Sequence, residues 1–263
     1  MNTFGRKFRV SIFGESHGEL IGVVLDGVPA GLELAEEDFT KDILRRKSGA
    51  KGTTPRLESD APQILSGVFE GHTTGAPLTI LFRNENVKSQ DYAQFAAMHR
   101  PGHADLTAAH RWDDCNDPRG GGHFSGRLTL PVVAAGVVAK KILADATILD
   151  ETPCAEVNAR IVELGGVECH VERSETSVEE ILRSAQNDNG GAQNDNGGAR
   201  NDTEGAQNDN VSGLSAEWQE AIEMAAKEGD SLGAVVECCV PDIDPGYGEP
   251  FWDSVESQIA HAI

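Results

Sequence analysis

Four short runs rich in β-branched and aromatic residues stand in the N-terminal part of the chain, separated by turn residues. They predict strands at residues 8–13, 22–25, 64–69 and 77–82. Asp26-Gly27 marks a turn after the second run. The loop 70–75 joins the third and fourth runs and predicts a hairpin.

Other segments show helical patterns. Residues 35–47 have acidic residues early and basic residues late, the order that complements a helix dipole. Residues 130–143 are almost all small or branched apolar residues before Lys140, which predicts a buried helix, with Pro131 tolerated in its first turn. Further helices are predicted at 104–112, 215–227 and 251–262, and further strands at 157–162 and 234–240.

A low-complexity segment interrupts this pattern. Residues 185–210 repeat a unit of Ala, Gln, Asn, Asp and Gly that has no apolar positions, so it cannot offset the entropy of ordering. We therefore expect a disordered insertion within 169–213, between a domain at 1–168 and its continuation at 214–263. The sequence stops inside a helical pattern without a C-cap, so we expect the C-terminal part of the domain to be missing.

Composition excludes several classes of protein. The chain has 22 basic and 43 acidic residues, a net charge of -21, which argues against binding to nucleic acid or to an anionic membrane. There is no signal-peptide h-region and no apolar stretch of membrane-spanning length. Five cysteines without a CxxC motif predict reduced thiols in a cytoplasmic protein.

The first motif with chemical potential is Gly14-Glu15-Ser16-His17-Gly18, directly after a predicted strand. Flanking glycines let the backbone approach a ligand, and His17 could give a proton to a leaving group near neutral pH. An ordinary turn with a solvated histidine explains this motif equally well. The pattern is not GxSxG, so a nucleophilic serine is not supported.

The second motif, Arg100-Pro101-Gly102-His103-Ala104-Asp105, places His103 at or near the start of the predicted helix 104–112. Bound anions are favoured at such a position, although a capping histidine without chemistry is the alternative. A zinc site of His99, His103 and His110 is disfavoured because Pro101-Gly102 interrupts the helix and no Cys or acid lies at ligand spacing. We expect no metal.

The third motif is the glycine-rich loop 119–127, which leads into the predicted buried helix. Free backbone N–H groups and Arg127 could bind a phosphate there. The loop matches neither GxGxxG nor a P-loop. The most basic part of the chain includes Arg46, Lys51 and Arg56; it is either a solvated surface or the place that holds a multiply anionic small molecule.

Together the three motifs resemble chorismate synthase, in order and in spacing. Supporting segments are NTFG at 2–5, DGVPAG at 26–31, ILSGVFEGHTTGAP at 64–77, SQDY at 89–92, GDSLGAVVE at 229–237 and GEPFWD at 248–253. The resemblance implies an anti-1,4-elimination of phosphate from 5-enolpyruvylshikimate 3-phosphate, the last step of chorismate biosynthesis, with reduced FMN and NADPH as a candidate electron source. It implies an α+β fold, helices sandwiched between antiparallel sheets, assembled as a homotetramer.

The resemblance also implies roles for two histidines. His17 would donate the proton that assists phosphate departure, and His103 would lie beside the reduced flavin and support its protonation state.

It further implies three FMN contacts and three contacts to substrate or nicotinamide nucleotide. The former are His123, Phe124 and Ser125; the latter are Arg46, Lys51 and Arg127. The alternatives are a non-catalytic remnant that binds phosphoanions and an unrelated phosphate-binding protein.

Overall fold

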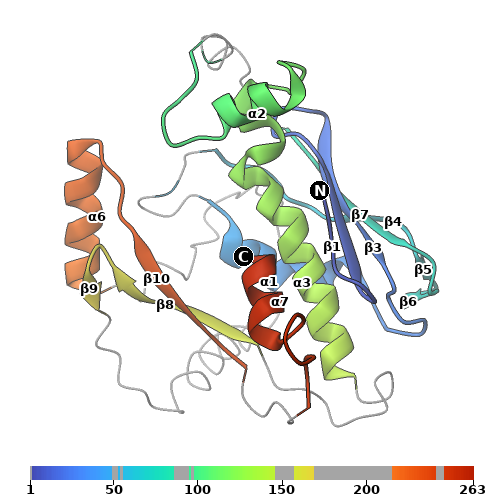
Figure 1. The fold of residues 1–263 in the computed structure, drawn as a ribbon. Coiled ribbons are helices and arrows are strands. Elements are labelled where there is room, and N and C mark those ends of the chain that lie inside the picture. The colour runs from blue at the N-terminus through green and yellow to red at the C-terminus, as the bar shows by residue number, and fades with distance from the viewer. Residues whose placement is uncertain are drawn as a thin grey trace, which may run out of the picture. The chain divides into compact units, whose positions relative to one another are not determined.

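The computed structural model describes residues 2–48, 53, 56–85, 95, 98–145, 157–168, 215–240 and 246–263 (Figure 1). Lys51 and the insertion predicted at 185–210 lie outside the described residues. Two compact units are present, Met1–Ala159 with Cys238–Ile263 and Arg160–Glu237. Among the described helices, none has both the length and the hydrophobicity to cross a bilayer.

A five-stranded antiparallel sheet lies in the first unit. Its strand order is β1-β2-β3-β7-β4, and the strands are Thr3–Phe4, Arg9–Gly14, Leu20–Asp26, Leu78–Arg83 and Gln63–Ser66. The predicted hairpin is confirmed because β4 pairs with β7. The stretch between them holds a smaller hairpin of β5 (Val68–Phe69) and β6 (His72–Thr73), which the prediction did not include.

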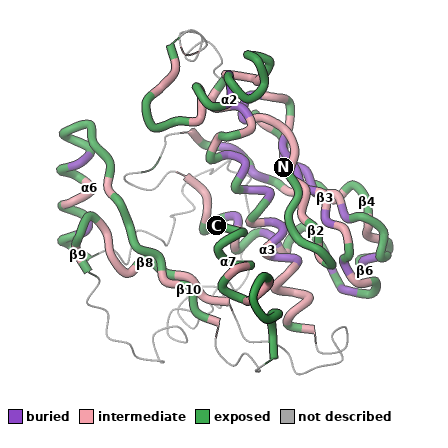
Figure 2. The backbone as a smooth tube through the Cα atoms, in the orientation of Figure 1, coloured by how far each residue is buried: buried purple, intermediate pink, exposed green. Residues whose placement is uncertain are grey.

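The core lies on one face of this sheet. Leu25 pairs with Leu78, Val23 with Ile80 and Ile21 with Phe82, so alternate residues of β3 and β7 face the same side. All six side chains are fully buried. Figure 2 marks buried residues along β3 and α3. Burying each such side chain contributes about 1.5–3 kcal/mol, which fixes the register of both strands.

Helix α3 (Thr129–Ala144) contacts the core face of the sheet, as the apolar run at 130–143 predicted. Pro131 lies in its first turn and is buried. The helix predicted at 35–47 is divided into a 3₁₀ turn, η1 (Glu36–Phe39), and α1 (Thr40–Arg46). Both contact α3, and Phe39 enters the same core.

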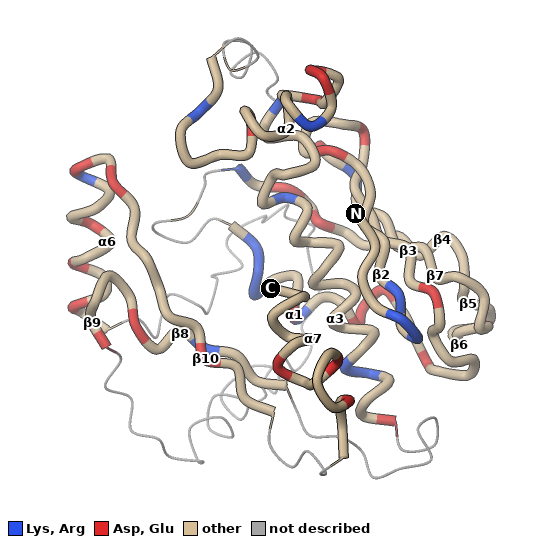
Figure 3. Tube along the Cα trace, in the orientation of Figure 1, with Lys and Arg blue, Asp and Glu red and all other residues tan. Residues whose placement is uncertain are grey.

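The second unit combines a small sheet with one helix. The sheet has the order β10-β8-β9, from Ala234–Cys239, Asn158–Leu164 and Val167–Glu168. Helix α6 (Ala216–Glu228) begins at Ser215, whose side chain accepts a hydrogen bond from the backbone N–H of Trp218. The Trp218 indole is buried and donates to the carbonyl of Val167 at 3.0 Å. Acidic residues recur along α6 (Figure 3).

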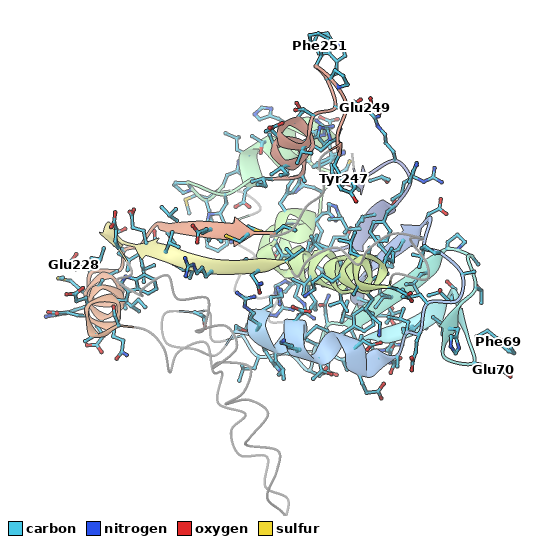
Figure 4. The ribbon with its side chains drawn as sticks, turned by 90° about the horizontal axis from the view of Figure 1, so that it is seen from below. Phe69, Glu70, Glu228, Tyr247, Glu249 and Phe251 are labelled. Carbon is cyan, nitrogen blue, oxygen red and sulfur yellow. The ribbon has the colours of Figure 1, made fainter. Side chains whose placement is uncertain are left out.

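Helix α7 (Val255–Ala262) starts later than predicted. Phe251 has a φ of +70°, which a helix does not admit, and Ser254 is the residue that caps the helix. The segment before the helix instead presents Tyr247 and Phe251 outward, and Phe251 is 86% exposed (Figure 4). Arg6 pairs with Asp253 at 2.6 Å, tying this segment to the N-terminus.

Candidate active site

The loop 14–18 between β2 and β3 holds His17 in a buried position. Ser16 is 1% exposed and His17 is 6% exposed, so the solvated-turn explanation is wrong. Gly14 has a φ of +93°, and a Cβ there would overlap the backbone of β3, so only glycine makes this turn. The backbone N–H of Gly18 donates to the carbonyl of Glu15 at 3.1 Å and closes the loop.

The glycine-rich loop lies directly against His17. It contains η3 (Arg119–Phe124), in which three successive glycines have positive φ values: 60° at Gly120, 85° at Gly121 and 54° at Gly122. The backbone N–H of Ser16 donates to the carbonyl of Gly122 at 3.0 Å. A Cβ at Gly120 would approach the His17 ring more closely than the 3.0 Å that real Cβ contacts keep. The glycines therefore let this backbone cover the imidazole.

An arginine paired with a carboxylate also contacts the loop 14–18. Arg56 donates to the Ser16 hydroxyl at 2.9 Å and to the Ser16 carbonyl at 3.1 Å, and it pairs with Glu58. Burial lowers the pKa of His17, with further lowering by Arg56 and then Arg119. The imidazole is therefore neutral at neutral pH.

Two further arginines, Arg127 and Arg46, share the carboxylate of Asp60. Arg127 forms a buried ion pair with Asp60, whose second oxygen lies 3.7 Å from Arg46. Arg127 also donates to the side-chain oxygen of Asn84 at 3.0 Å. Burial lowers the pKa of Arg46, and neighbouring Arg127 lowers it further against the opposing effect of Asp60.

The cluster as a whole has a positive excess. It contains three guanidinium groups and two carboxylates: Arg46, Arg56, Arg127, Glu58 and Asp60. In a chain with a net charge of -21, this local excess suits a multiply anionic ligand.

His103 lies on a neighbouring segment and is exposed. It directly precedes Ala104, the N-cap of α2 (Asp105–Trp112), as the sequence predicted. Its Nδ1 lies 3.1 Å from the carbonyl of Pro101, within its own turn. Two hydrogen bonds from Arg100, at 2.8 and 2.9 Å, lower the pKa of Asp105 to about 2 and fix the start of the helix.

A cavity of about 240 Å³ separates α2 from the glycine-rich loop. Its walls include Phe95, Ala108, Asp117, Gly121 and Phe124. Pockets that enclose small-molecule ligands usually have volumes of roughly 300–1,000 Å³. This cavity is smaller, so it could surround only part of such a ligand. Within the described ranges no group of His, Cys, Asp and Glu is placed to hold a metal ion.

The three predicted FMN contacts occupy different settings. His123 Nδ1 lies 2.8 Å from the carbonyl of Gly14, which ties the glycine-rich loop to the end of β2. The Phe124 ring is half exposed and packs 5.3 Å from that of Trp112. Ser125 caps the short turn η4 (Gly126–Leu128) by accepting from the backbone of Arg127.

Sequence reasoning missed Glu58, Asp60 and Asn84 as parts of the site. The alternation of charge in Arg56-Leu57-Glu58-Ser59-Asp60 was the one local signal for two of them. Asn84 has no such signal, because its partners at Glu15, Gly18 and Arg127 are all distant in sequence.

Comparison with known proteins gives a consistent picture. A family model described as chorismate synthase matches residues 8–263. Chorismate synthases of Chitinophaga pinensis and Dehalococcoides mccartyi are 45% and 38% identical to this chain over its whole length. The chain spans 62% and 65% of those two proteins. A crystal structure of chorismate synthase superposes with a TM-score of 0.60 at 24% identity, over 98% of this chain and 64% of that one, and confirms the α+β fold.

Proposed function

Because the chain belongs to the chorismate synthase family, we propose that it carries the phosphate-side half of the active site for eliminating phosphate from 5-enolpyruvylshikimate 3-phosphate. The observation that carries the proposal is the placement of His17. This buried imidazole lies between a glycine-rich loop and an arginine cluster with a positive excess. A leaving phosphate needs both a proton donor and fixed positive charge.

The surroundings of His17 favour uptake of a proton when the ligand binds. Burial, followed by the charge of Arg56, lowers the pKa of His17, so the imidazole alone holds no proton at neutral pH. A phosphate dianion beside it opposes the effect of Arg56 and raises the pKa. His17 then takes up a proton on binding and can donate it to the departing phosphate oxygen.

The proposed roles of Arg127 and Arg46 differ because Arg127 is more deeply buried. Arg127 is held by Asp60 and Asn84, so it contributes charge from a fixed position behind the site. Arg46, whose side chain is 22% exposed, is the proposed direct contact to substrate or to a nicotinamide nucleotide. For Lys51 we propose the same contact, on the family resemblance alone.

FMN would lie on the α2 side of the glycine-rich loop. The aromatic rings of Phe95 and Phe124 in the cavity wall fit a planar ring. His123 and Ser125 would hold the loop, and His103 would lie at the helix start. Reduced FMN, when bound, supplies the electron-rich ring that the family requires. Cytoplasmic location, assembly as a homotetramer and NADPH as electron source remain proposals from the resemblance.

A second candidate function is binding of phosphoanions without turnover. The observation that favours it is the positive excess of the arginine cluster, which can hold an anion whether or not a reaction follows.

Calorimetry with 5-enolpyruvylshikimate 3-phosphate, in two buffers of different protonation enthalpy, tests the proposal. Up to one proton should be taken up per site at neutral pH. His17→Ala should abolish the uptake, and the exposed His72→Ala should retain it. Binding without proton uptake would overturn the role of His17. Uptake without chorismate formation, assayed anaerobically with reduced FMN, would favour the second candidate.

A further inference from the structure

Glu58 is a buried carboxylate in the segment between α1 and β4. Its side chain is 3% exposed. One carboxylate oxygen accepts from Arg56 Nε at 2.8 Å, and the other accepts from the backbone N–H of Glu85 at 2.8 Å. A single carboxylate therefore joins two segments that are distant in sequence.

Both of those segments form hydrogen bonds with the loop 14–18. Arg56 binds the hydroxyl and the carbonyl of Ser16. Asn84, the neighbour of Glu85, donates to the carbonyls of Glu15 at 3.0 Å and Gly18 at 2.9 Å. Two segments thus hold the loop, and Glu58 contacts both of them.

We infer that Glu58 is a positioning residue, which fixes the imidazole of His17 against the glycine-rich loop by holding Arg56 and the segment 84–85. The inference rests on the proposed function, in which His17 delivers a proton to the departing phosphate. Small displacements of a catalytic group cost orders of magnitude in rate, so the loop needs such an anchor.

The rival explanation is that Glu58 acts through its charge alone. Charged groups from both sides face His17: Arg56 and Arg119 lower its pKa, whereas Asp117 and Glu58 raise it, and Arg56 has the largest effect of these charges. Loss of charge alone would therefore lower the pKa of His17. Loss of the anchor would release Arg56 and raise it.

Glu58→Ala in the 263-residue chain separates the two explanations. NMR should show a higher pKa for His17 than in the unmodified chain. Exchange of the Ser16 amide, which reports the bond to Gly122, should become roughly tenfold faster, the effect of losing about one hydrogen bond. Thr73→Val removes buried hydrogen bonds around Pro29 and Leu32 and should change neither readout.

A lower pKa with unchanged Ser16 exchange in Glu58→Ala would overturn the inference. Should that variant fail to fold, the double variant Arg56→Met, Glu58→Leu replaces the buried pair with apolar groups of similar size. Faster Ser16 exchange is expected there too, and unchanged exchange would overturn the inference. Neither readout needs turnover, so an absence of chorismate formation would count against the proposed function and not against the anchor.

Discussion

Replacing Asp60 with asparagine should destabilise the chain much more than removing a carboxylate from an exposed ion pair. The side chains of Asp60 and Arg127 are 3% and 6% exposed and form an ion pair. Asparagine keeps the volume and tolerates the φ of +55° at this position, so the main change is the loss of charge.

The magnitude follows from the burial of the remaining guanidinium. Removing one member of a buried ion pair costs about 3–5 kcal/mol because the other charge is left uncompensated. Arg127 keeps its bonds to Asn84 and to the carbonyl of Arg83, so we expect a loss near the lower end, about 3 kcal/mol. For a chain of this size that lowers the Tm by roughly 6–12 °C.

Urea and thermal unfolding followed by far-UV circular dichroism measure this loss. Asp26→Asn is the matched control, because Asp26 pairs with Arg9 at 43% and 52% exposure and such pairs contribute about 0–1 kcal/mol. Adding Arg127→Met to Asp60→Asn removes both charges of the buried pair. Arg46 stays charged but lies 3.7 Å from the carboxylate of Asp60 and is partly exposed, so most of the stability should be recovered. Equal losses in the two single variants, or no recovery in the double variant, would refute the reasoning.

Three further predictions concern the same region. Gly120→Ala should lower the stability by about 1–2 kcal/mol because the backbone there is left-handed. Calorimetry on this variant should show no proton uptake, because the added Cβ displaces the buried imidazole of His17. The control Gly126→Ala, whose Cβ meets nothing within 4 Å, should keep both the stability and the proton uptake. His123→Ala should lose about 1 kcal/mol in urea unfolding through the broken bond to the end of β2, and an unchanged stability would count against that bond. Because Arg100 lowers the pKa of Asp105 to about 2, the stability from this pair is present above about pH 4 and is lost as the pH falls through 2. Asp105→Asn should flatten that acid-side loss in a pH series of Tm values, and an unaltered pH profile would contradict the assignment.

The local pattern of the sequence predicted most elements of the fold. The strands β2, β3 and β7 and the helix α3 were predicted because their apolar periodicity reflects which face is buried. The late start of α7 was missed because a turn with a positive φ at Phe251 leaves no mark in hydrophobic spacing.

The candidate site was predictable only in part. His17 and the glycine-rich loop were found because their residue types are unusual next to a strand and a helix. Glu58, Asp60 and Asn84 escaped because their function depends on partners 27 to 69 residues away, and spacing along the chain carries no information about such pairings.

The bonds that hold the site also determine when it can form. Asn84 reaches Glu15 across 69 residues, and His123 reaches Gly14 across 109. Contacts between such distant residues require a large loop to close, and the entropy cost of closure comes before the contact adds any stability. They therefore form slowly compared with the local turns of α3. The β3–β7 pairs of the sheet are also long-range, so we expect the helix to form before the sheet and the imidazole to be fixed last. On the ribosome, the loop 14–18 would be complete in sequence and already in reach of Arg56 and Asn84, but its last anchor would be missing until residue 123 has been synthesised and has emerged.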